Sequence, residues 1–432
     1  MSAGGIGIVL IIFFVLLFLQ VPIAYAMGFA CLSFIYQTGT VSTTAFGQAF
    51  YTSVDTFTLL AIPLFILTGA LMENGGLARR LISFMESLVG QFTGGHAIAT
   101  VVTCAFFGAI SGSALATVAA IGGIMVPVML ENGYSKKFSY GLICASGCLG
   151  ILIPPSLPMV LYSAATDVSI GALFMGGFGP GILLTVLLCV VAYFIAKKSG
   201  IKGNGVKFSI RNVLRTAKEA IWAIFIPVII LGGIYGGFFT PTEAAAVACV
   251  YSIFAGTVIY RELKWTDLVK SIESTILSSS SIMIIVATAT MFGRVMSLMQ
   301  VPALITSTLQ AATSSKIVML LLVNALLLVV GCLMDTTPAI IILAPILLPL
   351  VTAYGVNSVH FGLIMVLNLA IGLCTPPVGA NLFVASGLGD IPVNSVIRAV
   401  IPFLITMLIT LVFVTYIPEI TLALPKLFGL IK

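Results

Sequence analysis

Long apolar runs follow one another along almost the whole chain, separated by short polar, glycine-containing or proline-containing stretches. A helix needs about 20 apolar residues to cross a bilayer, so runs of this length predict membrane helices. We expect helical segments near 4–20, 22–36, 54–73, 96–131, 135–166, 172–196, 219–237, 241–260, 264–298, 317–353, 357–388 and 394–420. The pattern predicts an all-α protein that crosses the membrane many times.

Three other segments differ from these runs. Residues 77–90 and 302–314 are short and mix apolar with polar positions, which favours amphipathic helices lying at the membrane interface. Residues 197–218 form the only polar stretch of any length, and they are rich in Lys and Arg. We interpret this stretch as a basic linker between two halves of the chain, 1–196 and 219–432.

The two halves repeat each other at a constant offset of 222 residues. This offset places Pro154-Pro155 on Pro376-Pro377 and Gly150 on Gly372, without a gap in the surrounding sequence. Matched Gly and Pro interruptions in two apolar halves are typical of transporters built from structural repeats, and they mark the transport site.

The charges predict how the repeats are oriented. With the linker in the cytoplasm, and with 96–131 and 317–353 as re-entrant hairpins, most of the 19 Lys and Arg residues fall on the cytoplasmic side. The first hairpin then enters from the cytoplasm and the second from outside. The predicted fold is therefore two inverted-topology repeats, each with a re-entrant helical hairpin and a broken helix, the latter at 135–166 and 357–388.

The composition excludes several classes of protein. At 60% hydrophobic and 7% charged residues, the chain is not an ordinary soluble domain. The basic residues do not interleave with aromatic ones, so nucleic-acid binding is not expected. Catalytic motifs and metal-ligand spacings are absent from the sequence, which argues against an enzyme. The eight cysteines all lie in apolar segments, and Cys144 and Cys148, which share a helix face, are expected to be small buried residues.

The two diproline pairs carry the first candidate chemistry. Proline interrupts helical hydrogen bonding, so each pair leaves backbone carbonyls free for a small cation. The half-helix after each break offers N–H groups to an anion. A mere kink is the alternative interpretation. Candidate substrate contacts are Pro155, Ser156, Pro377 and Asn381, together with Arg294, which could pair instead with lipid phosphate.

The tips of the hairpins carry the second candidate chemistry. The offset places Ser113 on Asp335, and Asp335 lies in an otherwise apolar stretch beside Thr336 and Thr337. A carboxylate at membrane depth is costly and therefore suggests a cation site. The alternative is a carboxylate satisfied by neighbouring hydroxyls and helix-start N–H groups. Glu243 fits a structural role at a helix start, and the two histidines fit solvated or capping roles.

Five motifs in order resemble one known family over essentially the whole chain: GAISGSALATVAAIG, GILIPPS, YGGFFTPTEAAAVA, GCLMDTTPAIIILAPILLP and GLCTPPVGANLFVASG. The chain is similar to the large membrane subunit of tripartite ATP-independent periplasmic (TRAP) transporters, DctM/SiaM type. The resemblance implies a scaffold with a mobile transport domain in the bacterial inner membrane, and coupling to sodium, with two or more ions and no organic cofactor. It also implies two partners: a small four-helix membrane subunit of the DctQ/SiaQ type on a separate chain, and a periplasmic substrate-binding protein of the DctP/SiaP type.

The hairpin tips and helix breaks, together with the ion sites that the resemblance implies, give two groups of candidate residues. The first sodium site is expected at Ser111, Gly112, Ser113, Thr117, Gly150 and Pro154. The second is expected at Gly331, Asp335, Thr336, Thr337, Gly372, Thr375 and Pro376.

The hypothesis that follows is a sodium-coupled importer of an organic anion, such as sialic acid or a C4-dicarboxylate, working by an elevator-type movement. A stand-alone sodium–carboxylate symporter without a binding protein is the first alternative. A membrane-embedded enzyme or a structural anchor subunit is the second.

Overall fold

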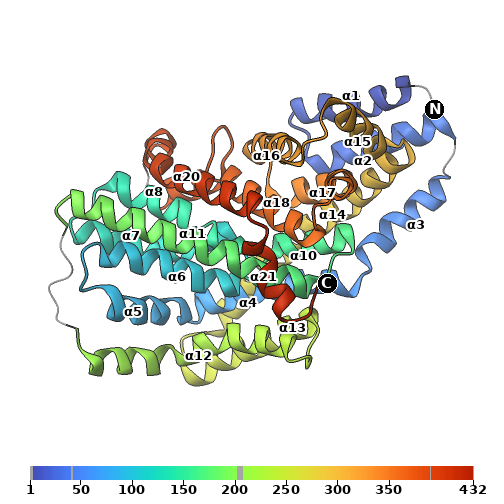
Figure 1. Cartoon of the computed structure of the whole chain (residues 1–432). Helices are drawn as coiled ribbons and strands as arrows, with labels where there is room; N and C mark the ends of the chain where they lie inside the picture. The colour runs from blue at the N-terminus through green and yellow to red at the C-terminus, as the bar shows by residue number, and fades with distance from the viewer. Residues whose placement is uncertain (1–2, 40–41, 202–207, 390, 432) are drawn as a thin grey trace.

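The computed structural model describes residues 3–39, 42–201, 208–389 and 391–431, and their regular structure is entirely helical (Figure 1). The first half contains α1 (Ala3–Phe18), α2 (Ile23–Thr38), α3 (Thr43–Val54), the 3-10 helix η1 (Phe57–Leu60), α4 (Ala61–Asn74), α5 (Leu77–Val89), α6 (Gly95–Ser111), α7 (Ala114–Glu131), α8 (Lys136–Ser146), α9 (Leu149–Leu152), α10 (Leu157–Thr166) and α11 (Ile170–Lys198). The second half contains α12 (Ile210–Tyr235), α13 (Pro241–Phe254), the π-helix η2 (Ala255–Ile259), α14 (Trp265–Leu298), α15 (Val301–Ala312), α16 (Lys316–Leu333), α17 (Thr336–Ala353), α18 (Ser358–Gly372), α19 (Ala380–Gly387), α20 (Val393–Tyr416) and α21 (Glu419–Leu427).

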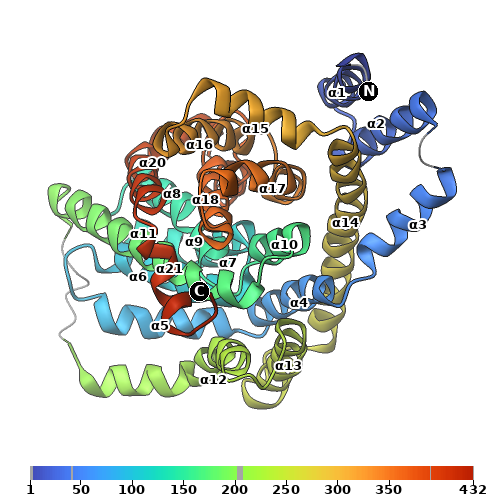
Figure 2. The same ribbon diagram turned by 45° about the vertical axis from the view of Figure 1, so that its right-hand side comes forward.

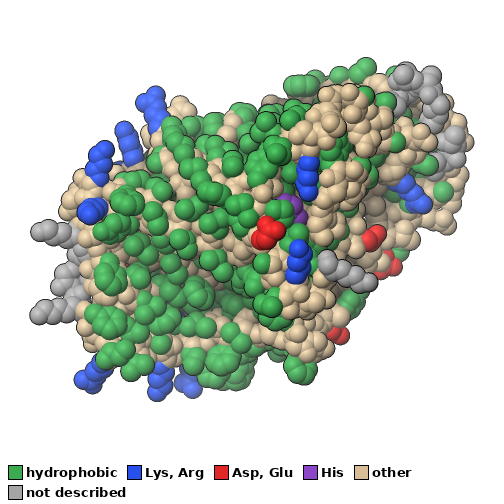
Figure 3. Space-filling model, viewed as in Figure 1, with side chains coloured by type: hydrophobic (Ala, Val, Ile, Leu, Met, Phe, Trp, Pro, Cys, Tyr) green, Lys and Arg blue, Asp and Glu red, His purple; other side chains and the backbone are tan. Residues whose placement is uncertain are grey.

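The helices have the lengths and surfaces of a membrane protein. Within the described part of the chain, nine helices are long and apolar enough to cross a bilayer. Figure 3 shows a broad hydrophobic face over α7 and α11, with Lys and Arg side chains gathered at the end where α11 stops and α12 begins. The predicted all-α, multi-pass architecture is confirmed.

Three helical segments differ from the sequence-based expectation. Helix α3 was not expected because its sequence, TTAFGQAFYTSV, is too polar to stand out, yet it packs on α14. The short α21 packs on α11 and was also missed. Helix α12 begins at Ile210, inside the stretch expected to be a linker, and residues 202–207 of that stretch lie outside the described residues. These helices are held by packing, which hydropathy does not report.

The repeat seen in the sequence is also a repeat of structure. At the offset of 222, α6 and α7 fall on α16 and α17, α10 falls on α19, and α11 falls on α20. The largest departure from the match is that α3, η1 and α4 of the first half correspond to the single 34-residue helix α14 of the second. Figure 2 shows α14 running along one side of the molecule, with α4 near one of its ends.

The two broken helices run antiparallel. Near the end of the first, the Tyr162 hydroxyl donates to the Ser358 carbonyl, at the start of the second, over 2.9 Å. Near the start of the first, the Tyr140 hydroxyl lies against Gly389, just after the end of the second. The repeats are therefore inverted.

The hairpins end at the depth of the breaks. The Gly112 carbonyl, in the tip between α6 and α7, accepts from the Leu157 N–H over 3.3 Å. The second hairpin repeats this contact, because the Cys332 carbonyl accepts from the Val378 N–H over 3.1 Å. Each tip thus meets the break of its own repeat. Since the broken helices are antiparallel, the two hairpins open toward opposite ends of the molecule.

Each half-helix after a break packs on the hairpin of the other repeat. Helix α10 contacts α17, and α19 contacts α7, so the hairpins and broken helices brace one another as one body. We call this body the hairpin body. Outside it, α4 and α14 pack on each other, α4 also packs on α13, and α14 also packs on α2. The amphipathic helix α5 joins the two groups, because it packs on both α6 and α4.

Both histidines are buried, so the expected solvated or capping roles are wrong. His96 lies with its Nδ1 atom 3.0 Å from a Glu86 carboxylate oxygen. His360 is 1% exposed, and its Nδ1 atom is 2.7 Å from the Thr421 hydroxyl. Helices α5 and α21 cover these positions, which look like segment ends in the sequence.

The start of α13 confirms the structural role expected for Glu243. The Thr240 hydroxyl accepts from the Glu243 N–H, and a Glu243 carboxylate oxygen accepts from the Thr240 N–H over 2.8 Å. This reciprocal pair is a capping box, which satisfies two free N–H groups at a helix start.

Replacing Thr240 with alanine should therefore destabilise the protein by about 1 kcal/mol. The detergent-solubilised variant should unfold at a lower temperature than the wild type in a thermal scan. Thr257→Ala is the matched control, since Thr257 is an exposed threonine whose hydroxyl donates to the Ile253 carbonyl and does not cap a helix N-terminus. Equal melting temperatures for all three proteins would contradict the role of the cap.

Candidate functional site

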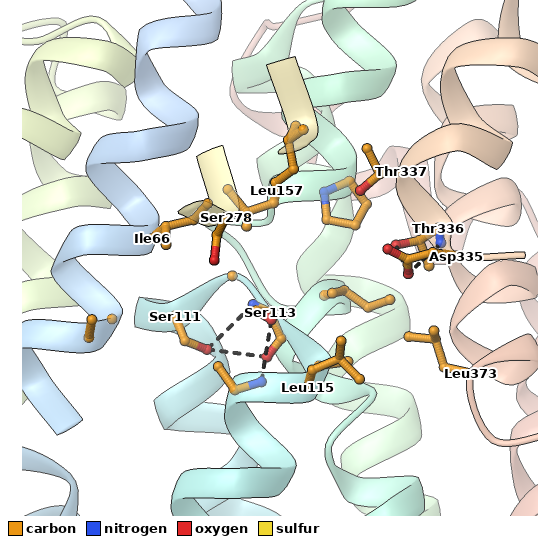
Figure 4. Close-up of a pocket in the computed structure, with 18 of the residues that line it drawn as sticks. Ile66, Ser111, Ser113, Leu115, Leu157, Ser278, Asp335, Thr336, Thr337 and Leu373 are labelled. Atoms are coloured by element: carbon orange, nitrogen blue, oxygen red, sulfur yellow. Dashed lines mark hydrogen bonds between the residues drawn. The ribbon is translucent and has the colours of Figure 1, made fainter. Parts of the chain in front are cut away.

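A cavity of about 440 Å³ lies where the tips of both hairpins meet α4, α10 and α14 (Figure 4). Its walls come from two groups of elements. The hairpin tips and the first turn of α10 contribute Ser111–Ala116, Asp335–Thr337, Leu157 and Pro158, and α4 and α14 contribute Ile66, Gly69, Ala70, Glu73, Ser274, Ser278 and Ile282.

The tip of the first hairpin is held by its own hydroxyl groups. The Thr117 hydroxyl donates to the Ser113 carbonyl over 2.8 Å. The Ser111 hydroxyl lies 3.2 Å from the Thr117 hydroxyl and accepts from the Ser113 N–H over 3.4 Å. The Gly112 backbone has a φ of +60°, which suits a residue without a Cβ atom. Three of the residues expected at the first sodium site, Ser111, Ser113 and Thr117, therefore bring their oxygen atoms into one cluster.

Gly150 completes this cluster from the broken helix. A Cβ atom at Gly150 would lie 2.5 Å from the Ser113 carbonyl oxygen and 2.5 Å from the Thr117 hydroxyl oxygen. The backbone of the broken helix can therefore approach the tip only because this residue is glycine. Pro154 is buried in the break itself and does not line the cavity.

Asp335 lies on the other side of the cavity, at the tip of the second hairpin, where Figure 4 shows it across from Ser113. Its carboxylate accepts from the Thr336 N–H over 2.7 Å and so caps α17. Within the described part of the chain, it has no cationic side chain as a partner. The capping role considered from the sequence is thus present, but it leaves the negative charge in the cavity uncompensated.

The remaining residues expected at the second site lie behind the tip. A Cβ atom at Gly372 would lie 2.3 Å from the Gly331 carbonyl carbon, so α16 and α18 touch through their backbones there. The Thr375 hydroxyl donates to the Ile371 carbonyl over 2.7 Å. Pro376 is exposed, but it does not line this cavity. Only Asp335, Thr336 and Thr337 of that group face the cavity.

The structure does not bring the expected substrate residues together at this cavity. Ser156 is fully buried and donates to the Ile151 carbonyl over 2.6 Å, and Pro155 is buried beside it. Asn381 is fully buried and donates to the Cys144 carbonyl over 3.1 Å. Pro377 is exposed but does not line the cavity. Arg294, on α14, does not line it either. The number of residues between a side chain and a helix break does not determine which way that side chain points.

The sequence interpretation missed the wall formed by α4 and α14. Glu73 is the ionisable residue of an apolar span, and Ser274 and Ser278 belong to a serine-rich part of a membrane helix. The rule that singled out Asp335 applies equally to Glu73. A polar residue on a membrane helix was therefore the signal that could have identified this wall.

The cavity combines features for both anions and cations. Helices α7, α10 and α17 all begin at its edge, and helix N-termini attract negative charge. Its lining contains the carboxylates Asp335 and Glu73 and several hydroxyls, but no Lys or Arg among the described residues. Carboxylate, hydroxyl and carbonyl oxygens suit a hard cation. The arrangement therefore suits an anion accompanied by cations.

Comparisons with known proteins find one transporter family. Residues 10–420 match the family model described as the tripartite ATP-independent periplasmic transporter, DctM component. A C4-dicarboxylate TRAP transporter large permease protein of Pseudomonas aeruginosa is 46% identical over 87% of each chain. A sialic acid TRAP transporter large permease protein of Vibrio cholerae is 38% identical over 96% of each chain.

Two further similarities concern length and fold. An isethionate TRAP transporter permease protein of Oleidesulfovibrio alaskensis is 44% identical over 94% of this chain, and the chain spans 64% of that longer protein. The solved structure of the Alcanivorax borkumensis YdaH transporter, reported to have an unusual topology, is 16% identical, with a TM-score of 0.60 over 87% of this chain and 89% of that one. The latter similarity concerns the fold alone.

Proposed function

Because the chain belongs to the DctM-component family of tripartite ATP-independent periplasmic transporters, we propose that it imports an organic anion together with sodium ions. Members of this family are large permease subunits and not enzymes. The family implies a bacterial inner membrane, in keeping with the nine described helices that are long and apolar enough to cross a bilayer.

The cavity between the hairpin tips is the observation that carries this proposal. Three helix N-termini provide N–H groups for a carboxylate or sulfonate of the cargo. The oxygen cluster around Ser113 and the uncompensated carboxylate of Asp335 provide two places for sodium ions. Bound cations would offset the charge of Asp335 and of the cargo, and so lower the cost of carrying both through an apolar membrane.

Sodium coupling also supplies the driving force. Each net positive charge moved inward gains about 2.3 kcal/mol per 100 mV of inside-negative potential. Two net charges would gain about 4–5 kcal/mol, which corresponds to more than a thousandfold accumulation.

The movement is proposed to be of the elevator type. The cavity lies between the hairpin body, made of the two hairpins and the two broken helices, and the helices α4 and α14. A body that slides along these two helices would carry the cargo from one side of the membrane to the other. The amphipathic helices α5 and α15 would connect the moving body to the fixed one.

Cargo and partners follow from the relatives and remain part of the proposal. The names of the relatives specify isethionate, C4-dicarboxylates and sialic acid, which share an anionic carboxylate or sulfonate group. We expect a periplasmic binding protein to deliver one such anion, and a small membrane subunit on a separate chain to complete the transporter. The basic stretch 197–218 would face the cytoplasm.

Reconstitution into liposomes tests the proposal. With the small subunit present, a sodium gradient imposed and the loaded binding protein outside, we expect uptake of radiolabelled isethionate, succinate or sialic acid. Omitting sodium or the binding protein should reduce uptake to background. Robust uptake by this chain alone would instead favour a stand-alone sodium–carboxylate symporter.

A further inference from the structure

Among the described residues that line the cavity, Glu73 is the carboxylate that the proposed function does not use. It lies in the last turn of α4 and lines the cavity one turn beyond Gly69, which contacts Ser111 at the tip of the first hairpin. The side chain is exposed to the cavity, and the described residues offer it no hydrogen-bond or ion-pair partner. The nearby Arg80 is already engaged, because it pairs with Glu262 and stacks on the Tyr260 ring.

This position is electrostatically unfavourable for a carboxylate. The C-terminal end of a helix carries partial negative charge, so an acidic side chain in the last turn of α4 opposes the helix dipole. The end of α4 is nevertheless fixed in place, since the Asn74 amide donates to the Ser271 hydroxyl on α14 over 2.9 Å. Packing thus holds an uncompensated negative charge in the wall of the cavity.

The two carboxylates of the cavity belong to different bodies. Asp335 is part of the hairpin body, whereas Glu73 is part of the α4–α14 wall. In an elevator movement only Asp335 would travel with the cargo, so the cargo would meet Glu73 at one end of the path only. That end is the one where α4 stops and α14 starts, near the basic residues Arg79 and Lys264, and the positive-inside rule makes it cytoplasmic.

We infer that Glu73 is a release gate that acts on the cargo anion at the cytoplasmic end of the cavity. While sodium ions are bound, the cargo and Asp335 are neutralised. When those ions leave, Glu73 repels the anion, speeds its departure and disfavours its return from the cytoplasm. The residue therefore lowers anion affinity on the inner side alone and limits inhibition of uptake by anion that has already accumulated, while the sodium gradient sets the direction of net transport. This inference rests on the proposed function.

Trans-inhibition in proteoliposomes tests the gate. Binding protein is added only outside, so that only correctly oriented molecules are active, and the liposomes are loaded with graded concentrations of the transported anion. In Glu73→Gln, the internal concentration that halves uptake should fall about five- to tenfold, while the external KM is unchanged. Glu73→Asp should keep the wild-type value, because the charge is retained.

Glu273→Gln is the matched control, since Glu273 is an exposed glutamate of α14 that does not line the cavity. It should behave as the wild type. A Glu73→Gln variant with the wild-type internal constant, or with equal shifts in the internal constant and the external KM, would overturn the gate. Absence of uptake by the wild type would overturn the proposed function itself, so the two failures are distinguishable.

Discussion

Asp335→Asn should abolish sodium-dependent uptake, or raise the sodium concentration for half-maximal uptake by about 10- to 100-fold. A charged contact of this kind contributes about 1.5–3 kcal/mol, which corresponds to that range. Asparagine caps a helix about as well as aspartate, so the substitution removes the charge but keeps the start of α17. The change therefore separates the proposed ion role from the capping role.

A sodium titration of uptake in proteoliposomes provides the measurement. Asp167→Asn is the control, because Asp167 is an exposed aspartate that follows α10 and does not line this cavity. Its sodium dependence should match the wild type. If Asp335→Asn retained a wild-type sodium titration, Asp335 would have no role in ion coupling.

Gly150→Ala should reduce uptake to a small fraction of the wild-type rate. The added methyl group would overlap the Ser113 carbonyl and the Thr117 hydroxyl, each at 2.5 Å, and would push the tip of the first hairpin off the broken helix. Overpacking of this kind costs about 1–3 kcal/mol and would displace the oxygen atoms of the first proposed sodium site. Uptake per correctly folded transporter, quantified after size-exclusion chromatography, measures the effect.

Gly123→Ala is the matched control for the same hairpin. Gly123 lies in α7, and a Cβ atom there would meet nothing within 4 Å. This variant should transport normally and should be as stable as the wild type. Normal uptake by Gly150→Ala would mean that the close approach of the broken helix to the tip is dispensable for transport.

Particular residues show how far the sequence predicted the site. The offset between the halves paired Ser113 with Asp335, and the structure places both at one cavity. The diproline pairs predicted both helix breaks, since proline cannot continue a helical hydrogen-bond pattern. The sequence did not predict that Asn381 points into the buried contact with Cys144, nor that Glu73 belongs to the cavity wall. Its sodium and substrate assignments remain predictions for the experiments above.

The sequence alone determined the features that depend on local chemistry: apolar length, proline breaks, the repeat and the charge bias between the two ends. Such features act within one helix or one loop, so they can be read without knowing its neighbours. Only the tertiary structure decided which polar groups share a cavity, because α4, α14 and the hairpin tips are far apart in the chain and meet through the antiparallel packing of the repeats. The direction of each side chain is set by that packing, and the same packing leaves Glu73 and Asp335 facing one space.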